Sequence, residues 1–500
     1  MANTGLAHRG KRWLYLIHRW VGIAACLLFL FWFLSGLVMV YMPFPALTSA
    51  ERLAGLPAID WPAVRIGPDA AERIASPDAP ARAIVLEMSA AEPVWRVTPA
   101  LGTQITISAK SGNRITRFDA DGAARIASAF GRAQVVAVET LIRDQWTVAG
   151  GFDAHRPLFR ARLAGPERRD LYVSSTTGAV VLDTNGSERF WNWLGSVPHW
   201  IYPTILRQNN AAWRQVVMWV SGPCILVALT GIWIGILRTR IGERRFPQRR
   251  MTPYHGWMLW HHVAGLAGGI TLTLWIFSGW LSVDPFRFFN GGPGLSAEAL
   301  ARYNGATALP TVDVEHLAAV TGDSVKRVEI IWAAGRAWAV AAGTGFTSSL
   351  DLRTLVPARV AGETLIAAAA QLSPRARIAG VETLFAPDAY WYALATLPQL
   401  PVLRVIFDDA VGTWVHIDPV TGRLLGSVDQ RGRAYRWVYD LFHKWDLNVL
   451  MLNRPVWDVI LWLLSLVGII TSLSGVWIGW KRVRRPAQHR SIEASRRATV

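Results

Sequence analysis

The sequence predicts a membrane protein in which four transmembrane α-helices form a bundle, built from two tandem parallel repeats that each carry an α+β domain outside the membrane. Three observations lead to this fold class. The chain contains four long apolar stretches, its basic residues cluster beside three of their ends, and its second half repeats residue patterns of the first.

The four apolar stretches cover residues 21–41, 213–237, 257–283 and 456–480. Crossing about 30 Å of hydrocarbon takes roughly 20 helical residues, so each stretch is long enough. Hydrophobic residues make up 52% of the chain and there are 26 Trp, as expected for spans with aromatic belts at the membrane surface. Pro223 falls inside the second span, where neighbouring helices can satisfy the carbonyl that it leaves free.

Basic residues cluster on one side of these spans. They are Arg9, Lys11, Arg12 and Arg19 before the first span, Arg238, Arg240, Arg244, Arg245, Arg249 and Arg250 between the second and third, and Lys481, Arg482, Arg484 and Arg485 after the fourth. The positive-inside rule then makes residues 1–20, 238–256 and 481–500 cytoplasmic. Residues 42–212 and 284–455 would lie in the periplasm of a bacterial inner membrane, and the first span would be a retained anchor. Since much of the net charge of +17 is explained by this topology, we expect a lipid bilayer and no nucleic acid as partner.

The repeat is visible at an offset of 243 residues, which changes to 244 in the periplasmic regions. The matched pairs are His18 with His261, Trp32 with Trp275, Ser35-Gly36 with Ser278-Gly279, Arg160 with Arg404, Trp193 with Trp437, His199 with His443, Trp213 with Trp457, and Thr230-Gly231 with Ser474-Gly475. Each half crosses the membrane twice and ends inside, so the two repeats share one topology. This arrangement implies a pseudo-twofold axis along the membrane normal.

The periplasmic regions show helix and hairpin patterns. Residues 171–173 and 179–182 predict two strands around a turn at Thr177-Gly178, and residues 414–417 and 423–425 predict the same around Thr421-Gly422. Helical patterns at residues 123–130 and 363–371 precede these hairpins. Each region therefore has room for helix-plus-sheet lobes.

Four of the 11 His residues stand out by position. His18 and His261 lie at the cytoplasmic ends of spans one and three, while His199 and His443 each precede a span at its outer end by 14 residues. An ionisable residue near the membrane core is costly and is therefore a functional candidate. Two neutral imidazoles on facing helices can take both axial positions of a b-type haem. We therefore expect His18 with His261 to hold an inner haem b and His199 with His443 to hold an outer one.

Other interpretations stay open at this stage. A single interfacial His is often only a hydrogen-bonded anchor, and His262 competes with His261 as a ligand. The mid-span pairs Ser35-Gly36, Ser278-Gly279, Thr230-Gly231 and Ser474-Gly475 could serve plain helix packing or make room for a porphyrin. Cys26 and Cys224 lie inside spans and form no metal-binding pattern.

Several charged residues have both a structural and a functional interpretation. Near the outer interface, Arg214, Asp446, Arg454 and Asp458 could anchor the helices or contact haem propionates. Arg160 and Arg404 could bind a ligand, although salt bridges explain them as well. The sequence shows no Walker A loop, no nucleotide-binding GxGxxG in context and no HExxH, so it predicts no nicotinamide or flavin domain of its own.

Five runs together resemble the PepSY-associated transmembrane proteins, also labelled iron-regulated membrane proteins. They are HRWVG at 18–22, the HH…G run at 261–265 with Ser278-Gly279, WVHIDPVTG at 414–422, LFH at 441–443 and LSGVWIG at 473–479. The resemblance covers nearly the whole chain and implies two PepSY-like periplasmic domains. One departure is Ser174-Ser175-Thr176, which replaces the Asp-Pro-rich turn in the first half and puts equal roles for the two domains in doubt.

Members of that family include inner-membrane ferrisiderophore reductases with haem b in the helix bundle. The resemblance implies a haem-dependent ferric reductase that passes electrons from an unidentified cytoplasmic or membrane donor to a periplasmic ferric siderophore or other ferric chelate. Its haem ligands would be His18, His261, His199 and His443. The alternative is a membrane-anchored PepSY module that binds or regulates a periplasmic protein without redox activity. A metal transporter is disfavoured because the spans contain no mid-membrane carboxylates.

Overall fold

The computed structural model describes residues 2–242, 245–289, 294–393 and 398–484. Arg244, Arg485 and most of the predicted tail lie outside these ranges. The chain forms two compact units. We call Met1–Phe44, Trp191–Phe289 and Tyr435–Val500 the helical unit, and Pro45–Phe190 and Asn290–Ala434 the sheet unit.

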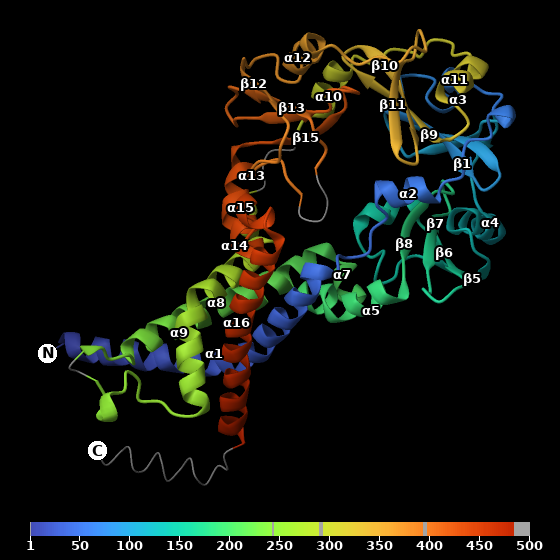
Figure 1. The fold of residues 1–500 in the computed structure, drawn as a ribbon. Helices are drawn as coiled ribbons and strands as arrows, with labels where there is room; N and C mark the ends of the chain where they lie inside the picture. Colours follow the sequence, from blue (N-terminus) through green and yellow to red (C-terminus); the bar gives the residue numbers. More distant parts are fainter. Residues whose placement is uncertain (1, 243–244, 290–293, 394–397, 485–500) are drawn as a thin grey trace. The chain divides into compact units, whose positions relative to one another are not determined.

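The helical unit contains four helices that are long and apolar enough to cross a membrane (Figure 1). They are α1 (Ala2–Tyr41), α8 (Asn210–Leu237), α9 (Trp257–Leu281) and α16 (Arg454–Val483). The chain is therefore a multi-pass membrane protein. Helix α1 begins well before the apolar stretch at 21–41, because a helix continues through polar residues as long as its backbone hydrogen bonds do. His18 consequently lies within α1.

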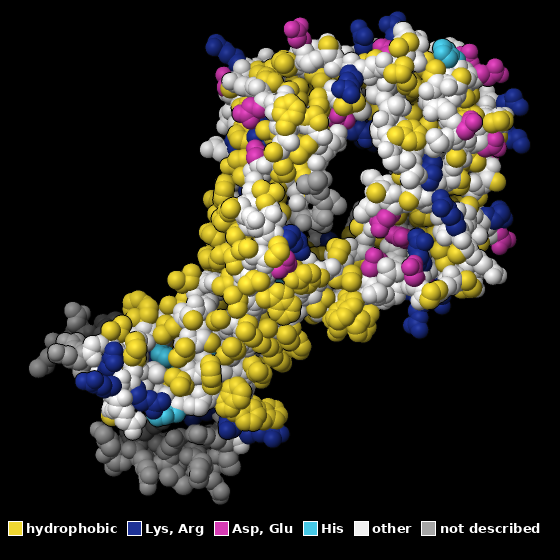
Figure 2. Space-filling model, viewed as in Figure 1, with side chains coloured by type: hydrophobic (Ala, Val, Ile, Leu, Met, Phe, Trp, Pro, Cys, Tyr) yellow, Lys and Arg dark blue, Asp and Glu magenta, His cyan; other side chains and the backbone are white. Residues whose placement is uncertain are grey.

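The four helices share one packed interior. Helix α1 contacts α8 and α16, and α9 contacts the same two helices. Their core consists of Ala25, Phe29, Phe33, Cys224, Val227, Ala228, Leu272 and Ile276. Figure 2 shows hydrophobic side chains gathered over the surface of the long helices. Exposed large apolar residues on these helices include Leu27, Phe31, Trp219, Ile270 and Trp462. A helix that is apolar on all sides suits a lipid environment.

Short helical segments precede the second and fourth long helices. Before α8 they are α5 (Gly186–Leu194), α6 (Ser196–His199) and α7 (Thr204–Arg207). Before α16 they are α13 (Gln430–Tyr435), a π-helical turn (Arg436–Asp440), α14 (Leu441–Lys444) and α15 (Asn448–Met451). These segments position His199 and His443.

The sheet unit contains three antiparallel sheets. The largest has the order β11-β10-β9-β1-β2-β3-β4. Its strands are β1 (Ala83–Ser89), β2 (Glu92–Thr98), β3 (Ile105–Ser108), β4 (Arg114–Ile115), β9 (Val325–Ala333), β10 (Arg336–Gly343) and β11 (Phe346–Asp351). Helices α3 (Pro68–Ala75) and α11 (Val314–Thr321) contribute Ala71 and Leu317 to the hydrophobic core on one face of this sheet.

Two four-stranded sheets have the same order and are each preceded by a helix. One is β5 (Val135–Leu141), β6 (Leu158–Leu163), β7 (Asp170–Ser174) and β8 (Val180–Thr184), with α4 (Ala120–Gly131). The other is β12 (Ile378–Leu384), β13 (Val402–Phe407), β14 (Trp414–Ile417) and β15 (Leu424–Val428), with α12 (Gly362–Ala370). Both predicted hairpins and both predicted helices are thus present.

The remaining elements are short. They are α2 (Ser49–Gly55) and α10 (Ala297–Asn304), with 3-10 turns at Trp61–Ala63, Gly150–His155, Pro247–Arg249 and Pro285–Arg287. A capping box fixes the start of α2, in which Thr48 accepts from the Glu51 amide and Glu51 accepts from the Thr48 amide.

The seven-stranded sheet differs from the expectation of two separate external domains. Strand β1, from the first region, pairs with β9, from the second, with Glu87 opposite Arg327. Each region alone would leave an open strand edge, and pairing the two edges satisfies their backbone groups. The alternating pattern of a strand does not reveal its partner, so the sequence could not show this joint sheet.

Candidate functional site

The four His residues predicted as ligands lie in two pairs within the helical unit. The ring centroids of His18 and His261 are 6.3 Å apart, and those of His199 and His443 are 6.1 Å apart. Each pair combines one residue from the first half of the chain with one from the second half. Both pairings are the ones that the sequence predicts.

The first pair lies between α1 and α9, and each ring is held by a neighbouring long helix. His18 Nδ1 is 3.1 Å from the carbonyl oxygen of Val227 and 3.4 Å from the Thr230 hydroxyl on α8. His261 Nδ1 is 2.9 Å from the carbonyl oxygen of Thr471 and 3.2 Å from the Ser474 hydroxyl on α16. A carbonyl only accepts hydrogen bonds, so in both rings Nδ1 carries the proton.

The second pair is held in the same way. His199 Nδ1 is 3.2 Å from the carbonyl oxygen of Trp32 and 3.1 Å from the Ser35 hydroxyl on α1. His443 Nδ1 is 3.1 Å from the Ser278 hydroxyl on α9. All four rings therefore have their Nδ1 beside the hydroxyl of one predicted Ser/Thr-Gly pair.

The hydroxyl groups beside the imidazoles belong to Thr230, Ser35, Ser278 and Ser474, and none of them donates its proton to the imidazole. Each hydroxyl donates to the backbone carbonyl four residues earlier in its own helix, and the acceptors are Leu226, Phe31, Leu274 and Ile470. The hydroxyl oxygen therefore accepts from the imidazole Nδ1–H. This fixes the tautomer and leaves the Nε2 lone pair of every ring available to coordinate a metal.

The glycine of each Ser/Thr-Gly pair faces the same imidazole ring. A Cβ built on Gly231 would lie 2.8 Å from His18 Cε1, and one on Gly36 would lie 3.2 Å from His199 Cε1. For Gly475 and His261 the distance is 3.3 Å, and for Gly279 and His443 it is 3.5 Å. The sequence left two roles open for these glycines, helix packing and room for a porphyrin. In the structure an imidazole is the nearest side chain to Gly231, Gly36 and Gly279, whereas Cys26 lies closer to Gly475 than His261 does.

The substitution Gly231→Ala should destabilise the helical unit by about 1–3 kcal/mol, since the added methyl group overpacks against a ring that two hydrogen bonds hold in place. The measurement is thermal unfolding of the detergent-purified chain. Gly22→Ala is the matched control, because its Cβ would lie 3.7 Å from Val227 Cγ1, an ordinary contact in the same helix pair. If both variants lose the same stability, contact with the His18 ring is not the cause. The same holds if Gly231→Ala remains destabilising in a His18→Ala background.

The spacing of the rings fits a metal between them. An imidazole nitrogen lies about 2.0–2.1 Å from a bound transition metal and the ring centre about 1.1 Å further, so two axial rings have centroids roughly 6.3 Å apart. The observed separations are 6.3 and 6.1 Å. Each pair provides two ligands, and the nitrogens of a porphyrin would occupy the remaining positions around an iron.

The two pairs lie at different heights along the helices. His18 and Trp32 are 14 residues apart on α1, which is about 21 Å at 1.5 Å per residue. His261 and Trp275 have the same spacing on α9. Since Trp32 and Trp275 adjoin the second pair, the two sites are separated by most of the thickness of a bilayer.

The turns that carry His199 and His443 end in the same backbone conformation. Ile201 and Trp445, each two residues after the His, have left-handed φ values of 51° and 54°. Trp213 Nε1 donates to the Trp200 carbonyl at 3.0 Å, and Trp457 Nε1 donates to the Trp445 carbonyl at 3.0 Å. The first turn of each following long helix therefore holds the turn that bears His199 or His443. A β-branched residue such as Ile201 rarely adopts this conformation, so the surrounding contacts must impose it.

Three features near His443 add to the candidate site, and of their residues the sequence patterns singled out only Asp446. Tyr435 stacks on Tyr439 with centroids 4.9 Å apart, and Tyr439 stacks on His443 at 5.4 Å. The i, i+4, i+8 spacing of these three residues was the signal that could have revealed the stack. Residue 195, which aligns with Tyr439 at the offset of 244, is Gly, so the first half has no equivalent.

The other two features are polar. Arg436 and Asp446 form a buried ion pair at 2.8 Å, and Asp446 is 0% exposed. The indole Nε1–H of Trp445 is buried without a hydrogen-bond partner among the described residues. A buried donor beside His443 suits a carboxylate such as a haem propionate.

The competing His residues point elsewhere. His262 Nε2 is 3.3 Å from the Thr239 hydroxyl, and its ring contacts that of Tyr254 with centroids 5.2 Å apart. His255 contacts Arg250, which donates to it from Nη1. In this structure His18 is therefore paired with His261 and not with His262.

The charged residues near the second pair have local partners. Arg214 donates to the carbonyl oxygens of Val283 at 2.7 Å and Asp284 at 3.1 Å. Asp458 accepts from Tyr41 at 3.2 Å and from Arg454 at 3.4 Å. These contacts match the anchoring interpretation of both residues.

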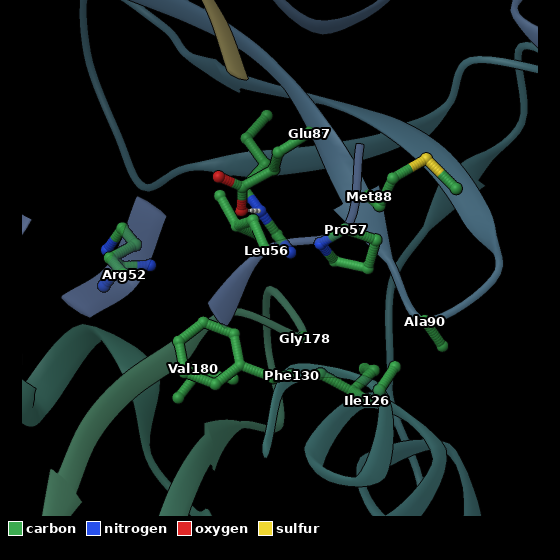
Figure 3. Close-up of a pocket in the computed structure, with 12 residues that line it drawn as sticks. Arg52, Leu56, Pro57, Glu87, Met88, Ala90, Ile126, Phe130, Gly178 and Val180 are labelled. Carbon is green, nitrogen blue, oxygen red and sulfur yellow. Dashed lines mark hydrogen bonds and ion pairs between the residues drawn. The ribbon is translucent and has the colours of Figure 1, made fainter. Parts of the chain in front are cut away.

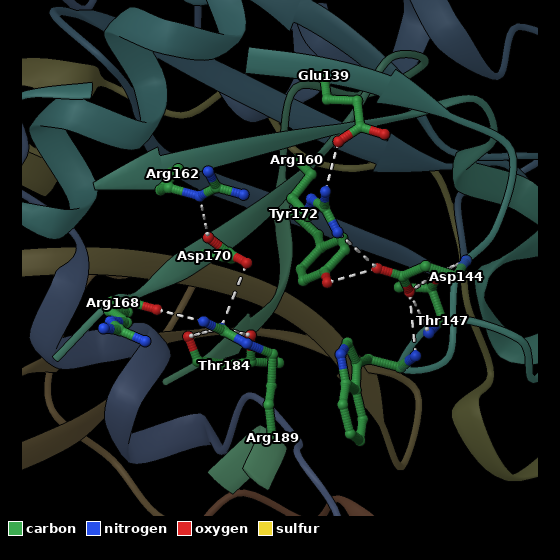
Figure 4. Close-up of polar contacts among 11 residues, drawn as sticks. Glu139, Asp144, Thr147, Arg160, Arg162, Arg168, Asp170, Tyr172, Thr184 and Arg189 are labelled. Atoms are coloured by element: carbon green, nitrogen blue, oxygen red, sulfur yellow. Dashed lines mark hydrogen bonds and ion pairs between the residues drawn. The ribbon is translucent and has the colours of Figure 1, made fainter. Parts of the chain in front are cut away.

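In the sheet unit, Arg160 and Arg404 are salt-bridged. Figure 4 shows Arg160 between Glu139 and Asp144, with Tyr172 donating to Asp144 at 2.7 Å. Arg160 and Tyr172 thus hold Asp144, which lies in the loop after β5.

Arg404 bonds Asp388 with two nitrogens, at 2.6 and 2.9 Å, and donates from Nε to His416 Nε2 at 2.9 Å. Burial and the neighbouring Arg404 lower the pKa of His416 to about 4, so its ring is neutral and can accept this bond.

Comparison with known families supports the membrane assignment. The family model for the PepSY-associated TM region matches residues 15–324, more than half of the chain. The chain belongs to the PepSY-associated TM family. The matched region contains His18, His199 and His261 of this PepSY-associated protein, while His443 lies beyond it. No curated protein matches the chain.

Proposed function

We propose that this PepSY-associated membrane protein is a transmembrane oxidoreductase that binds two haem b groups and reduces a ferric siderophore or another ferric chelate. One observation carries the proposal. Two His pairs, separated along the helices, have ring centroids 6.3 and 6.1 Å apart, the separation expected of two imidazoles bound to one metal.

In this proposal the two halves are tandem copies with one topology, arranged as a parallel-repeat bundle. The matching order of the β5–β8 and β12–β15 sheets supports this, as do the matched contacts of the four His residues. The positive-inside rule, applied to the basic segments, supports a bacterial inner membrane with both termini in the cytoplasm. His18 and His261 would then face the cytoplasmic side, and His199 and His443 the periplasmic side.

The residues of the chain would hold and orient the cofactor. His18 and His261 would hold the iron of the inner haem, and His199 and His443 that of the outer one. Haem, when bound, supplies one-electron redox chemistry. The hydroxyl and carbonyl partners of each Nδ1–H fix the ring orientation and raise the basicity of Nε2. The apolar core of α1, α8 and α9 would shield bound haem from water.

The overall reaction balances as a one-electron transfer. A cytoplasmic or membrane donor loses one electron, and one Fe(III) ion of the periplasmic chelate gains it and becomes Fe(II). Two sites separated by about 21 Å along the helices divide the crossing of the bilayer into short steps.

The decisive experiment is a dithionite-reduced minus oxidised absorption spectrum of the detergent-purified protein, with a pyridine haemochrome assay for stoichiometry. We expect a b-type α-band and about two haems per chain, one for each His pair. Ferric chelates should then reoxidise the reduced protein. A colourless protein after expression with ample haem would refute the proposal and favour a membrane-anchored module that binds or regulates a periplasmic protein.

A further inference from the structure

A pocket in the sheet unit lies apart from the two His pairs and from the function proposed for them. It lies between α2, α4, the strands β1 and β2, and the turn that joins β7 to β8 (Figure 3). Its volume is about 300 Å³ including the open mouth, and its enclosed part is hardly larger than a water molecule. Any ligand must therefore insert a small group.

The floor of the pocket is charged. Arg96 donates from Nε to Glu87 at 2.6 Å, and both residues are only 4% exposed. Arg96 also donates to the Thr106 hydroxyl and to the Thr177 carbonyl, which brings the β7–β8 turn onto this face of the sheet. The Glu87–Arg96 pair is thus buried, and its hydrogen bonds tie the pocket together.

More positive charge surrounds this pair than Glu87 can neutralise. Arg327 lies directly opposite Glu87 in the β1–β9 register. Its Nη2 contacts Glu329 at 3.2 Å, while its Nε is buried without a hydrogen-bond partner among the described residues. Arg52 approaches from α2 on the other side. Burial raises the pKa of Glu87, but the positive charges of Arg96, Arg52 and Arg327 outweigh this effect and lower it, so all three guanidinium groups act on one carboxylate.

Arg52 is the guanidinium that a ligand can reach. It lines the pocket, is half-buried, and has no ion pair or side-chain hydrogen bond within the described ranges. Burial lowers the pKa of Arg52, Glu87 opposes this effect, and Arg327 and Arg96 add to it. A cation in such surroundings gains free energy when an anion binds beside it.

The rest of the lining is apolar. It includes Leu56, Pro57, Met88, Ile126, Phe130 and Val180. A ligand that places its charged group against Arg52 would therefore have its remaining atoms against hydrophobic side chains. A cationic side chain beside an apolar wall suits an anion that carries a small hydrocarbon group.

We infer that this pocket binds the carboxylate group of a small organic acid, with Arg52 as its main cationic contact and Phe130 and Leu56 against its apolar part. The inference is independent of haem binding, because the pocket shares no residue with the His pairs.

The test uses the full-length chain in detergent, with sodium butyrate as the probe. Butyrate should raise the Tm of the sheet unit in a saturable manner, compared with sodium chloride at equal ionic strength. 1-Butanol, which has a similar apolar body without charge, should have no such effect. A butyrate response no larger than that to chloride or 1-butanol would overturn the inference.

Variants then locate the site. Arg52→Gln should weaken butyrate binding at least about tenfold, as removal of a charged hydrogen-bonding partner does. Arg65→Gln, an exposed arginine outside the pocket, should leave binding unchanged. If Arg52→Gln does not fold, Ala129→Glu keeps Arg52 and places a negative charge in the pocket wall, and it should also abolish binding. Butyrate binding that survives in Arg52→Gln or Ala129→Glu would overturn the assignment.

Discussion

Replacing His443 with alanine should lower the haem content from about two groups per chain to about one, because a b-type haem held by two axial imidazoles loses one ligand while the other pair is untouched. His18→Ala should have the same effect on the other site. The measurement is the pyridine haemochrome assay on purified variants, with the reduced-minus-oxidised spectrum showing which component is lost.

The control for these variants is His262→Ala. His262 neighbours His261 in the sequence, but its ring contacts Tyr254 and the Thr239 hydroxyl. Its removal should leave two haems bound. The double variant His18→Ala/His443→Ala should bind none. Haem content that is unchanged in His443→Ala, or reduced equally in His262→Ala, would show that the His pairs are not the ligands.

Asp446→Ala should destabilise the helical unit by about 3–5 kcal/mol, because it leaves the guanidinium of Arg436 buried without its carboxylate partner. Asp446 is 0% exposed and Arg436 is 5% exposed, so water cannot replace the lost contact. Thermal unfolding of the purified protein measures the effect. The turn that bears His443 lies between these two residues, so the outer site should lose haem at a lower temperature than the inner one.

Asp440→Ala is the matched control. Asp440 pairs with Lys444 at 2.6 Å in the same segment, but this pair is partly exposed. Its removal should change stability by at most about 1 kcal/mol, the range of surface ion pairs. An apolar replacement of both buried partners, Arg436→Met with Asp446→Leu, should recover most of the stability that Asp446→Ala loses. If Asp440→Ala and Asp446→Ala are equally destabilising, burial is not the cause.

The membrane spans could be predicted from local hydropathy, and the His pairs from the internal repeat. Hydropathy marks the spans, and the offset of 243–244 residues relates His18 to His261 and His199 to His443. The hairpins around Thr177-Gly178 and Thr421-Gly422 likewise follow from strand and turn residues close in sequence.

Other features depend on contacts that no local pattern specifies. The partner of each His Nδ1 lies 164 or more residues away in the chain, as for Ser35 with His199. The π-helical turn at Arg436–Asp440, which lies within the stack of Tyr435, Tyr439 and His443, is not marked in the sequence. The ion pair of Arg436 with Asp446 likewise depends on how the chain reverses after α14.

The pairing of β1 with β9 has a consequence for how the chain is made. About 240 residues separate these two strands, so one edge of β1 stays unpaired until the second half of the chain has been synthesised. Long-range pairing of this kind folds slowly, and an exposed strand edge invites aggregation or proteolysis in the meantime. The gene therefore cannot be divided between α8 and α9 into two halves that mature alone. One fragment would contain β1 without β9, and the other would contain β9 without β1.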